Sequence, residues 1–164
     1  MGIRGKVSGV QDREIGEKLG SVGVLLEMWR VFADGAEAYL RTLEAFSDGI
    51  ISNIKRSDPS FRFDLANNTY CFHFTMRTHE VAEIRCLVSR REDLKPTQED
   101  TDTSLSSVAS LVVNGTGGVY RAIVIEGQQE DFGSNNESAT RRMNTIFAGI
   151  LNENLLTGKI ALPD

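Results

Sequence analysis

The chain has 164 residues, of which 25% are charged and 40% hydrophobic, and its formal net charge is −5. These proportions are those of a folded globular protein, and they exclude the disordered and collagen-like classes. One hydrophobic core is the simplest arrangement at this length, so we expect a single domain over residues 1–164. The acidic balance argues against nucleic-acid binding, which needs a clustered positive surface.

The sequence contains no run of about eighteen apolar residues, the length that a membrane span needs. Its start, Met1 to Lys6, also lacks the apolar run of a secretory signal, so we expect a cytoplasmic protein without membrane contact. Two cysteines and two histidines at these spacings fit no zinc motif, and we expect neither a metal nor a cofactor. Residues 1–14 are polar and glycine-rich, which predicts a flexible arm.

Apolar residues recur at a seven-residue spacing from Ile15 to Ile54, which indicates a long helix that packs lengthwise against another helix. If this helix is broken, Asp34-Gly35 is the expected place, since a glycine weakens a helix by about 1 kcal/mol relative to alanine. If it is continuous, it is about 60 Å long. A compact domain of this size is only about 40 Å across, so another chain is expected to cover the excess.

We therefore expect a homo-oligomer whose interface consists of residues of the repeat: Leu19, Val22, Leu26, Trp29, Ala33, Ala36, Leu40 and Leu43. A second stripe at the same spacing is expected to pack on the aromatic face of the chain's own sheet: Leu25, Phe32, Tyr39 and Phe46. The alternative interpretation makes the whole wide apolar face part of the core of one chain.

After Asp58-Pro59 the apolar period changes from seven to two, which is the alternation of β-strands. Asn67-Asn68 is expected to form a two-residue hairpin turn. Closing the hairpin there pairs Leu65 with Tyr70, Phe63 with Phe72 and Phe61 with Phe74, all on one face.

A third strand is expected to add small and aliphatic residues to the same face: Ala82, Ile84, Cys86 and Val88. The charged segment 90–104 is expected to be a mobile loop. Two further strands, Leu105 to Val113 and Val119 to Glu126, flank a glycine-rich hairpin connection. The result is a five-stranded antiparallel meander.

The last element begins at a predicted capping box, Ser134 to Glu137, and is expected to end before Gly158. Its apolar residues define one face of an amphipathic helix: Ala139, Met143, Ile146, Phe147, Ile150 and Leu151. The fold class is therefore α+β, with a long N-terminal helix, a five-stranded antiparallel meander and a C-terminal amphipathic helix.

The polar face of the sheet gathers Arg62, His73 and Arg85 on three neighbouring strands. Two guanidinium groups beside an imidazole can bind a phosphate or a carboxylate, although cross-strand charge pairing on a solvated face explains the same pattern. Cys71 lies two residues from His73, which places a thiol beside a base. Because no third orienting group accompanies them, we predict no catalytic residues.

These patterns indicate a non-enzymatic, self-associating interaction protein, such as an assembly, regulatory or adaptor subunit, with a protein partner that the sequence does not identify. Two alternatives stay open. One is a binder of a small anionic ligand or nucleotide on the outer sheet face through Arg62, His73 and Arg85. The other is a chaperone-like dimer that holds partner segments on its exposed sheet.

Overall fold

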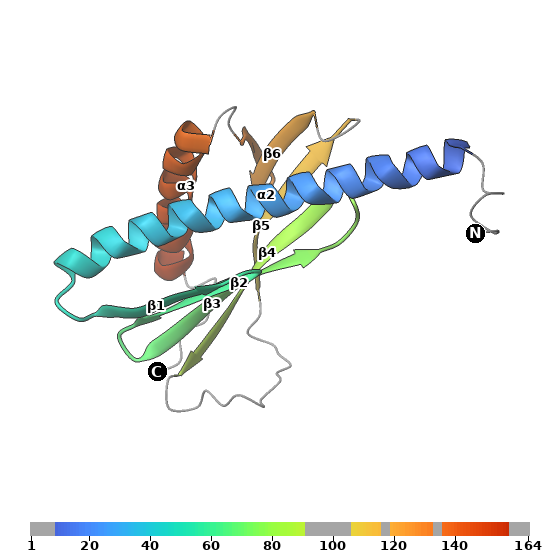
Figure 1. The fold of residues 1–164 in the computed structure, drawn as a ribbon. Helices are drawn as coiled ribbons and strands as arrows, with labels where there is room; N and C mark the ends of the chain where they lie inside the picture. The colour runs from blue at the N-terminus through green and yellow to red at the C-terminus, as the bar shows by residue number, and fades with distance from the viewer. Residues whose placement is uncertain (1–8, 91–105, 116–118, 133–135, 158–164) are drawn as a thin grey trace.

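The computed structural model describes residues 9–90, 106–115, 119–132 and 136–157. They form an α+β fold in which a seven-stranded antiparallel sheet carries two helices on one face (Figure 1). The strands lie side by side in chain order. The elements are α2 (Gly9–Phe46), β1 (Ile51–Ser57), β2 (Ser60–Leu65), β3 (Asn68–Met76), β4 (Val81–Arg90), β5 (Ser106–Asn114), β6 (Tyr120–Ile125), β7 (Gln128–Asp131) and α3 (Asn136–Thr157).

Helix α2 is continuous through Asp34-Gly35 and crosses α3 there (Figure 1). A Cβ atom added at Gly35 would lie 2.6 Å from the backbone nitrogen of Asn144 and 2.7 Å from the carbonyl oxygen of Thr140. Glycine is thus required at this crossing because the two helix backbones meet, rather than because the helix breaks. Of the predicted flexible arm, residues 9–14 are helical, and residues 1–8 lie outside the described part of the chain.

The predicted end of the helix at Ile54 is wrong, since α2 ends at Phe46 and Ile51–Ser57 forms strand β1. Asp48 and Gly49 adopt left-handed backbone conformations, with φ of 54° and 89°, and turn the chain. The Ser47 hydroxyl accepts a hydrogen bond from the Ile51 amide at 3.1 Å. The seven-residue spacing continued through this turn by coincidence, and pairing with β2 decides the conformation of the segment.

The meander has seven strands rather than the expected five, because β1 and β7 were not predicted. Strand β7 consists of Gln128, Gln129, Glu130 and Asp131, all exposed, so it has no apolar alternation to recognise. A turn with positive φ at Glu126 and Gly127 brings it beside β6. The predicted loop 90–104 lies outside the described residues, except for Arg90, which ends β4.

The predicted hairpin register is displaced by two residues. Phe63 pairs with Tyr70 and Phe61 with Phe72, and the turn is Ala66-Asn67, with Ala66 at φ 56°. This register places Asp64 opposite Thr69, whose hydroxyl donates a hydrogen bond to the carboxylate at 2.7 Å. Since a shift of two keeps each side chain on its face, the aromatic residues still line the inner face.

The core lies between this inner face and the two helices. Phe147 of α3 contacts the rings of Phe61, Phe63 and Phe72 at centroid distances of 5.9, 6.5 and 5.4 Å. The predicted apolar face of α3 is buried along its length: Ala139, Met143, Ile146, Phe147, Ile150 and Leu151. Ser134 of the predicted capping box and Gly158 both lie outside the described residues.

Trp29 joins α2 to the sheet. Its ring lies 5.8 Å from that of Phe61, and its indole nitrogen donates a hydrogen bond to Asp58 at 3.1 Å. Of the second stripe, Phe32 and Tyr39 contact Phe147 of α3 at 6.0 and 6.1 Å. Phe46, the last member of that stripe, is 80% exposed, so it does not pack on the sheet as expected.

Candidate functional site

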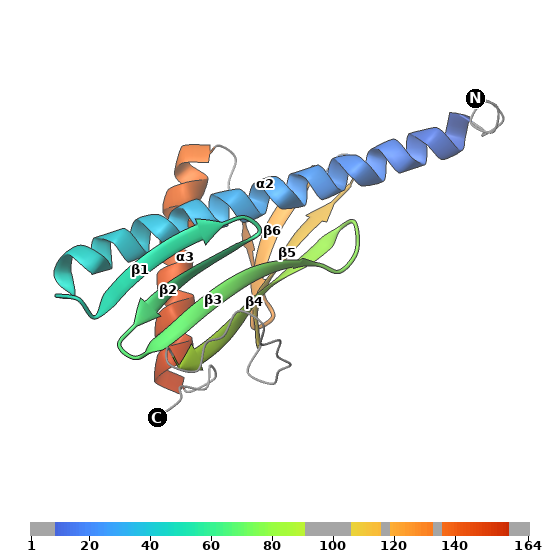
Figure 2. The same cartoon turned by 60° about the horizontal axis from the view of Figure 1, so that its bottom comes forward.

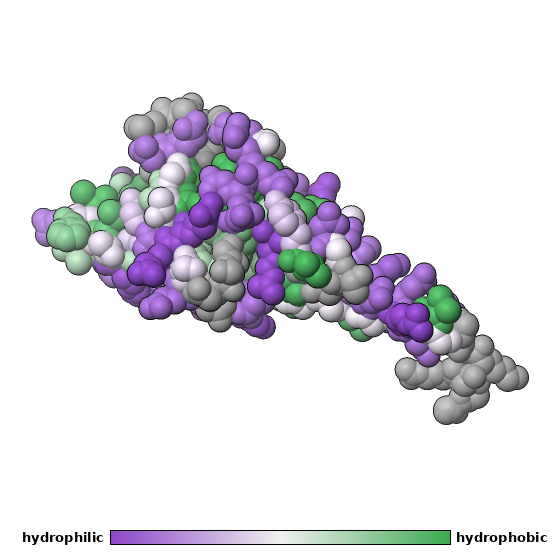
Figure 3. Space-filling view, turned by 90° about the horizontal axis from the view of Figure 1, so that it is seen from above, coloured by the Kyte–Doolittle hydropathy of each residue, from purple (hydrophilic) through white to green (hydrophobic). Residues whose placement is uncertain are grey.

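The first turns of α2 extend beyond the sheet as a narrow arm (Figure 2). Every residue from 9 to 20 is exposed, and we refer to this segment as the projecting arm. Figure 3 shows hydrophobic atoms among hydrophilic ones on this part of the molecule. The arm extends the predicted heptad pattern away from the body of the protein, so its apolar residues lack cover from the described residues.

Three exposed apolar side chains form one stripe along this end of α2. Ile15, Leu19 and Leu26 are 51%, 64% and 36% exposed, and Val22, which lies between them, is half-buried. Their spacing of four, three and four residues places them on one side of an α-helix. We call these four residues the arm stripe. Val10 is 61% exposed but lies on nearly the opposite side of the helix.

The eight residues of the predicted interface divide into two groups. Trp29, Ala33, Ala36 and Leu40 are buried against the chain's own sheet and α3, and Leu43 packs at the edge of that core. A side chain buried in this way has no surface to offer a second copy. Leu19, Val22 and Leu26 keep such a surface, and their place at an interface stays a prediction.

Three glycines accompany the arm stripe. A Cβ atom added at Gly16, Gly20 or Gly23 would have no atom within 4 Å outside the helix itself. Each glycine weakens the helix by about 1 kcal/mol relative to alanine, and the described residues show no packing that requires it. Gly35, by contrast, is in contact with the backbone of α3. Because these three positions have no side chain, the backbone of another helix could approach this part of α2 closely.

The outer face of the sheet carries the predicted anion-binding residues. His73 lies directly opposite Arg85, whereas Arg62 lies opposite Cys71. The Cys71 sulfur is 3.3 Å from Nε2 of His73. A carboxylate oxygen of Glu83 lies 4.0 Å from Nε of Arg85 and 3.6 Å from Arg77, so negative charge is present within the cluster.

The ionisation of this cluster follows from its burial. Burial raises the pKa of the Cys71 thiol, although the positive charge of Arg62 opposes the effect. Burial also lowers the pKa of His73, and the charge of Arg85 acts in the same direction. At neutral pH the pair is therefore a thiol beside an uncharged imidazole rather than a thiolate–imidazolium pair. Cys86 lies on the inner face, where burial raises its thiol pKa strongly.

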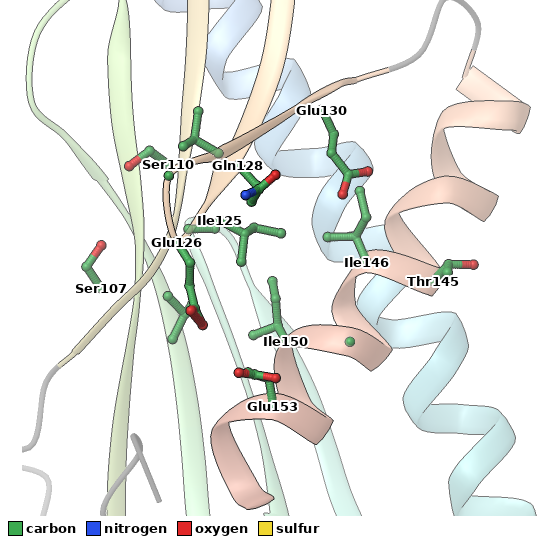
Figure 4. Close-up of a pocket in the computed structure, with 15 residues that line it drawn as sticks. Ser107, Ser110, Ile125, Glu126, Gln128, Glu130, Thr145, Ile146, Ile150 and Glu153 are labelled. Carbon is green, nitrogen blue, oxygen red and sulfur yellow. The ribbon is translucent and has the colours of Figure 1, made fainter. Parts of the chain in front are cut away.

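A groove of about 650 Å³ separates α3 from the strands β5 to β7 (Figure 4). Ile125 of β6, which is half-buried, lies on one side of it, and Ile146 and Ile150 of α3, which are buried in the core, lie on the other. Gly149 lines the same groove, and a Cβ atom added there would meet nothing within 4 Å. This volume is within the range of binding pockets for small molecules and side chains.

Carboxylates dominate the charge of this groove. Glu126, Glu130 and Glu153 line it, and the lining residues include no lysine, arginine or histidine. Arg142, outside the lining, forms an ion pair with Glu130 at 3.3 Å. The sequence pattern did not predict this groove because its lining residues come from four separate elements.

Comparison with protein-family models, with curated proteins and with solved structures found no match for this chain. Within the described residues, no helix is both long enough and apolar enough to cross a membrane. The same part of the chain contains no group of three or more His, Cys, Asp or Glu side chains placed to hold a metal ion. The candidate sites are therefore the arm stripe, the outer-face cluster and the groove.

Proposed function

We propose that the protein is a non-enzymatic interaction protein that self-associates through the projecting arm of α2. The observation that carries this proposal is the arm stripe, a row of apolar side chains on a helix that extends beyond its own core. Burying such side chains against a second copy removes apolar surface from water, which is favourable by about 25 cal/mol per Å². A cytoplasmic location and an assembly, regulatory or adaptor role stay predictions.

The glycines beside the arm stripe support the same proposal. Gly16, Gly20 and Gly23 weaken an isolated helix, yet nothing among the described residues uses the space that they leave. Two arms packed together would use it, because small residues let helix backbones approach closely. Their arrangement beside the arm stripe favours a helical partner over a sheet or a loop.

The alternatives have less support. An anionic ligand at Arg62, His73 and Arg85 would meet the carboxylate of Glu83, which lies within 4.0 Å of Arg85. Thiol-based catalysis is disfavoured because burial raises the pKa of Cys71 and keeps the nucleophilic thiolate scarce at neutral pH. The structure offers no specific observation in favour of the chaperone-like alternative.

A matched pair of variants tests the proposal. Leu19→Glu places a charge in the arm stripe, whereas Val10→Glu places the same charge on the other side of the same helix at similar exposure, 61% against 64%. Both sites are exposed, so neither change should unfold the protein. Light scattering after size-exclusion chromatography should show an oligomer for the parent and for Val10→Glu. Leu19→Glu should raise the dissociation constant at least tenfold.

Two results would contradict the proposal. One is a parent mass equal to the monomer at every concentration measured. The other is an equal effect of the two variants, because a response to added charge alone would not depend on the side of the helix.

A further inference from the structure

We propose that two projecting arms pack antiparallel, so that the arm stripe of one copy lies along the arm stripe of a second copy in the opposite direction. In this arrangement Asp12 of each copy forms an ion pair with Arg30 of the partner subunit. The pairing rests on the proposed self-association, and it defines the direction of the two helices, their register and the charged residues that set it. The surface is the end of α2 that extends beyond the sheet (Figure 2).

The arm stripe has the same pattern in both directions. Its four apolar residues are spaced by four, three and four positions, and this order is unchanged when the helix is reversed. Two antiparallel arms centred on the middle of the stripe therefore bring Ile15 opposite Leu26 and Leu19 opposite Val22. A patch that is complementary to itself in this way is what a two-fold symmetric dimer requires.

Asp12 and Arg30 lie beyond the two ends of the stripe. They are 18 residues apart, which is about five whole turns, so both lie on the same side of α2. Within one chain they are about 27 Å apart along the helix axis, too far for an ion pair. The antiparallel arrangement places each beside the other's counterpart in the partner subunit. Arg30 bonds Glu27 at 3.3 Å, but both side chains are about half exposed, and a guanidinium has donors for a second carboxylate.

A parallel pair fits the same residues less well. Parallel helices in register place each residue of the stripe beside its own copy, so Asp12 would meet Asp12 of the partner subunit and the two carboxylates would repel each other. The length of the exposed stripe also fits the antiparallel pair. The stripe ends where Trp29, 1% exposed, enters the core, and the residue that lies opposite this point in the partner arm is Asp12, near the start of the described helix.

The glycines agree with the same direction. Gly16 and Gly23 lie on the side of the stripe that carries Asp12 and Arg30, and a Cβ atom added at either glycine would meet nothing within 4 Å. Antiparallel helices bring this side of one helix beside the same side of the other, so the glycines of the two copies face each other. In a parallel pair they would face the opposite side, which carries Lys18.

An exchange of charges between two copies tests the register. Asp12→Arg and Arg30→Glu should each raise the dissociation constant of the dimer at least tenfold, because each change places like charges together at both ends of the pair. An equimolar mixture of the two variants should form a mixed dimer with an affinity within threefold of the parent. In that dimer the introduced arginine meets the introduced glutamate at one end, and the two original residues meet at the other. An affinity tag on one variant identifies the mixed dimer by mass in light scattering.

The matched controls are Glu17→Arg and Arg13→Glu, which make the same changes of charge on the far side of the same arm. Each should associate within twofold of the parent, and their mixture should associate no more tightly than either alone. Recovery in the mixture of Asp12→Arg and Arg30→Glu also separates a contact between copies from a folding defect, since mixing does not repair a misfolded chain.

Spin labels measure the direction of the two arms. Val10→Cys and Glu17→Cys each introduce a labelling site in a chain that carries Cys71→Ser, where the remaining Cys86 is buried. In the antiparallel dimer the two labels at residue 10 are about 32 Å apart along the helix axis and those at residue 17 about 10 Å apart. Pulsed electron paramagnetic resonance should therefore give a distance at least about 10 Å longer for residue 10. A parallel dimer gives equal distances.

Two results would overturn the antiparallel pairing while self-association itself stands: an oligomeric parent whose label distances are equal at residues 10 and 17, or charge variants that do not recover when mixed. A parent that is monomeric at every concentration would overturn both proposals. Because the mass of the parent is measured separately from the label distances and the mixtures, the two failures can be told apart.

Discussion

The contact between Gly35 and α3 predicts that one methyl group will separate the two helices. In Gly35→Ala, the new Cβ would lie 2.6 Å from the Asn144 nitrogen, 2.7 Å from the Thr140 oxygen and 2.8 Å from the Met143 Cβ. Two of these are backbone atoms, which cannot move by a change of rotamer. Ordinary contact begins at 3.4 Å, so α2 and α3 must move apart by about 0.8 Å.

A displacement of this size affects the whole crossing. A radial gap of roughly 0.5–1 Å forfeits a quarter to a half of the dispersion energy of each contact that it opens. Overpacking of this kind destabilises proteins by about 1–3 kcal/mol, while the helix propensity of alanine returns at most about 1 kcal/mol. We therefore expect a net loss of about 1–2 kcal/mol, and a Tm lower by roughly 2–8 °C for a chain of this size.

Gly20→Ala is the internal control, since it makes the same change in the same helix where a Cβ would meet nothing within 4 Å. It should raise stability by about 0.4–1 kcal/mol. Urea denaturation followed by circular dichroism measures both variants. The measurement should use two protein concentrations, so that any effect on association is separated from the effect on folding.

The outcome depends on whether each variant has a higher or a lower free energy of unfolding than the parent. The reasoning is refuted if Gly35→Ala is as stable as the parent or more stable. It is also refuted if Gly20→Ala is destabilised as much as Gly35→Ala at both concentrations, because helix propensity alone would then not distinguish the two sites.

Two further predictions concern ionisable groups. Burial tends to raise the pKa of Asp58, but hydrogen bonds from Arg56 and Trp29 and the charge of Arg56 lower this pKa below the ordinary 3.8. The ionised carboxylate therefore contributes to stability above that pH, and the contribution is lost in stronger acid. Asp58→Asn should lower the free energy of unfolding by about 1 kcal/mol at neutral pH, which is less than for a buried pair because the carboxyl is 43% exposed. Below pH 3.8 the urea midpoint of the variant should approach that of the parent. Plots of urea midpoint against pH that stay parallel for the two proteins would contradict this. Burial also raises the thiol pKa of Cys71 and, more strongly, that of Cys86, so a thiol-reactive disulfide reagent should modify Cys71 slowly at neutral pH and Cys86 only after unfolding. Reaction of Cys71 at the rate of a free thiol, or loss of the slow phase in Cys86→Ser rather than in Cys71→Ser, would show that the assignment is wrong.

The helix, the aromatic face of the sheet and the apolar face of α3 were predictable because each rests on a periodic pattern. A register error of two residues leaves each strand side chain on the same face of the sheet. The inner face was therefore predicted correctly, although the turn lies at Ala66-Asn67 rather than Asn67-Asn68. The seven-residue period predicts the end of a helix less reliably. It continued by chance into Ile51–Ser57, where the positive φ of Asp48 and Gly49 and the pairing with β2 are decisive.

The remaining features depend on tertiary contacts. Strand β7 has no apolar residue, and only its hydrogen bonds to β6 define it. The role of Gly35 cannot be recognised from its neighbours in sequence, because Thr140, Met143 and Asn144 supply the contact. The groove is a similar case, since Ile125, Gly149 and Glu153 share a surface only after α3 folds back over the sheet.

The α2–α3 crossing also has a consequence for synthesis of the chain. The seven described strands lie between the two helices in sequence, so α2 leaves the ribosome before them and α3, which packs on Gly35, leaves after them. Each hairpin of the meander can close as it emerges, because its strands are neighbours in sequence. The apolar side of α2 lacks part of its cover throughout that interval. Nascent chains that stop before α3 should therefore be the species most prone to aggregate or to bind chaperones.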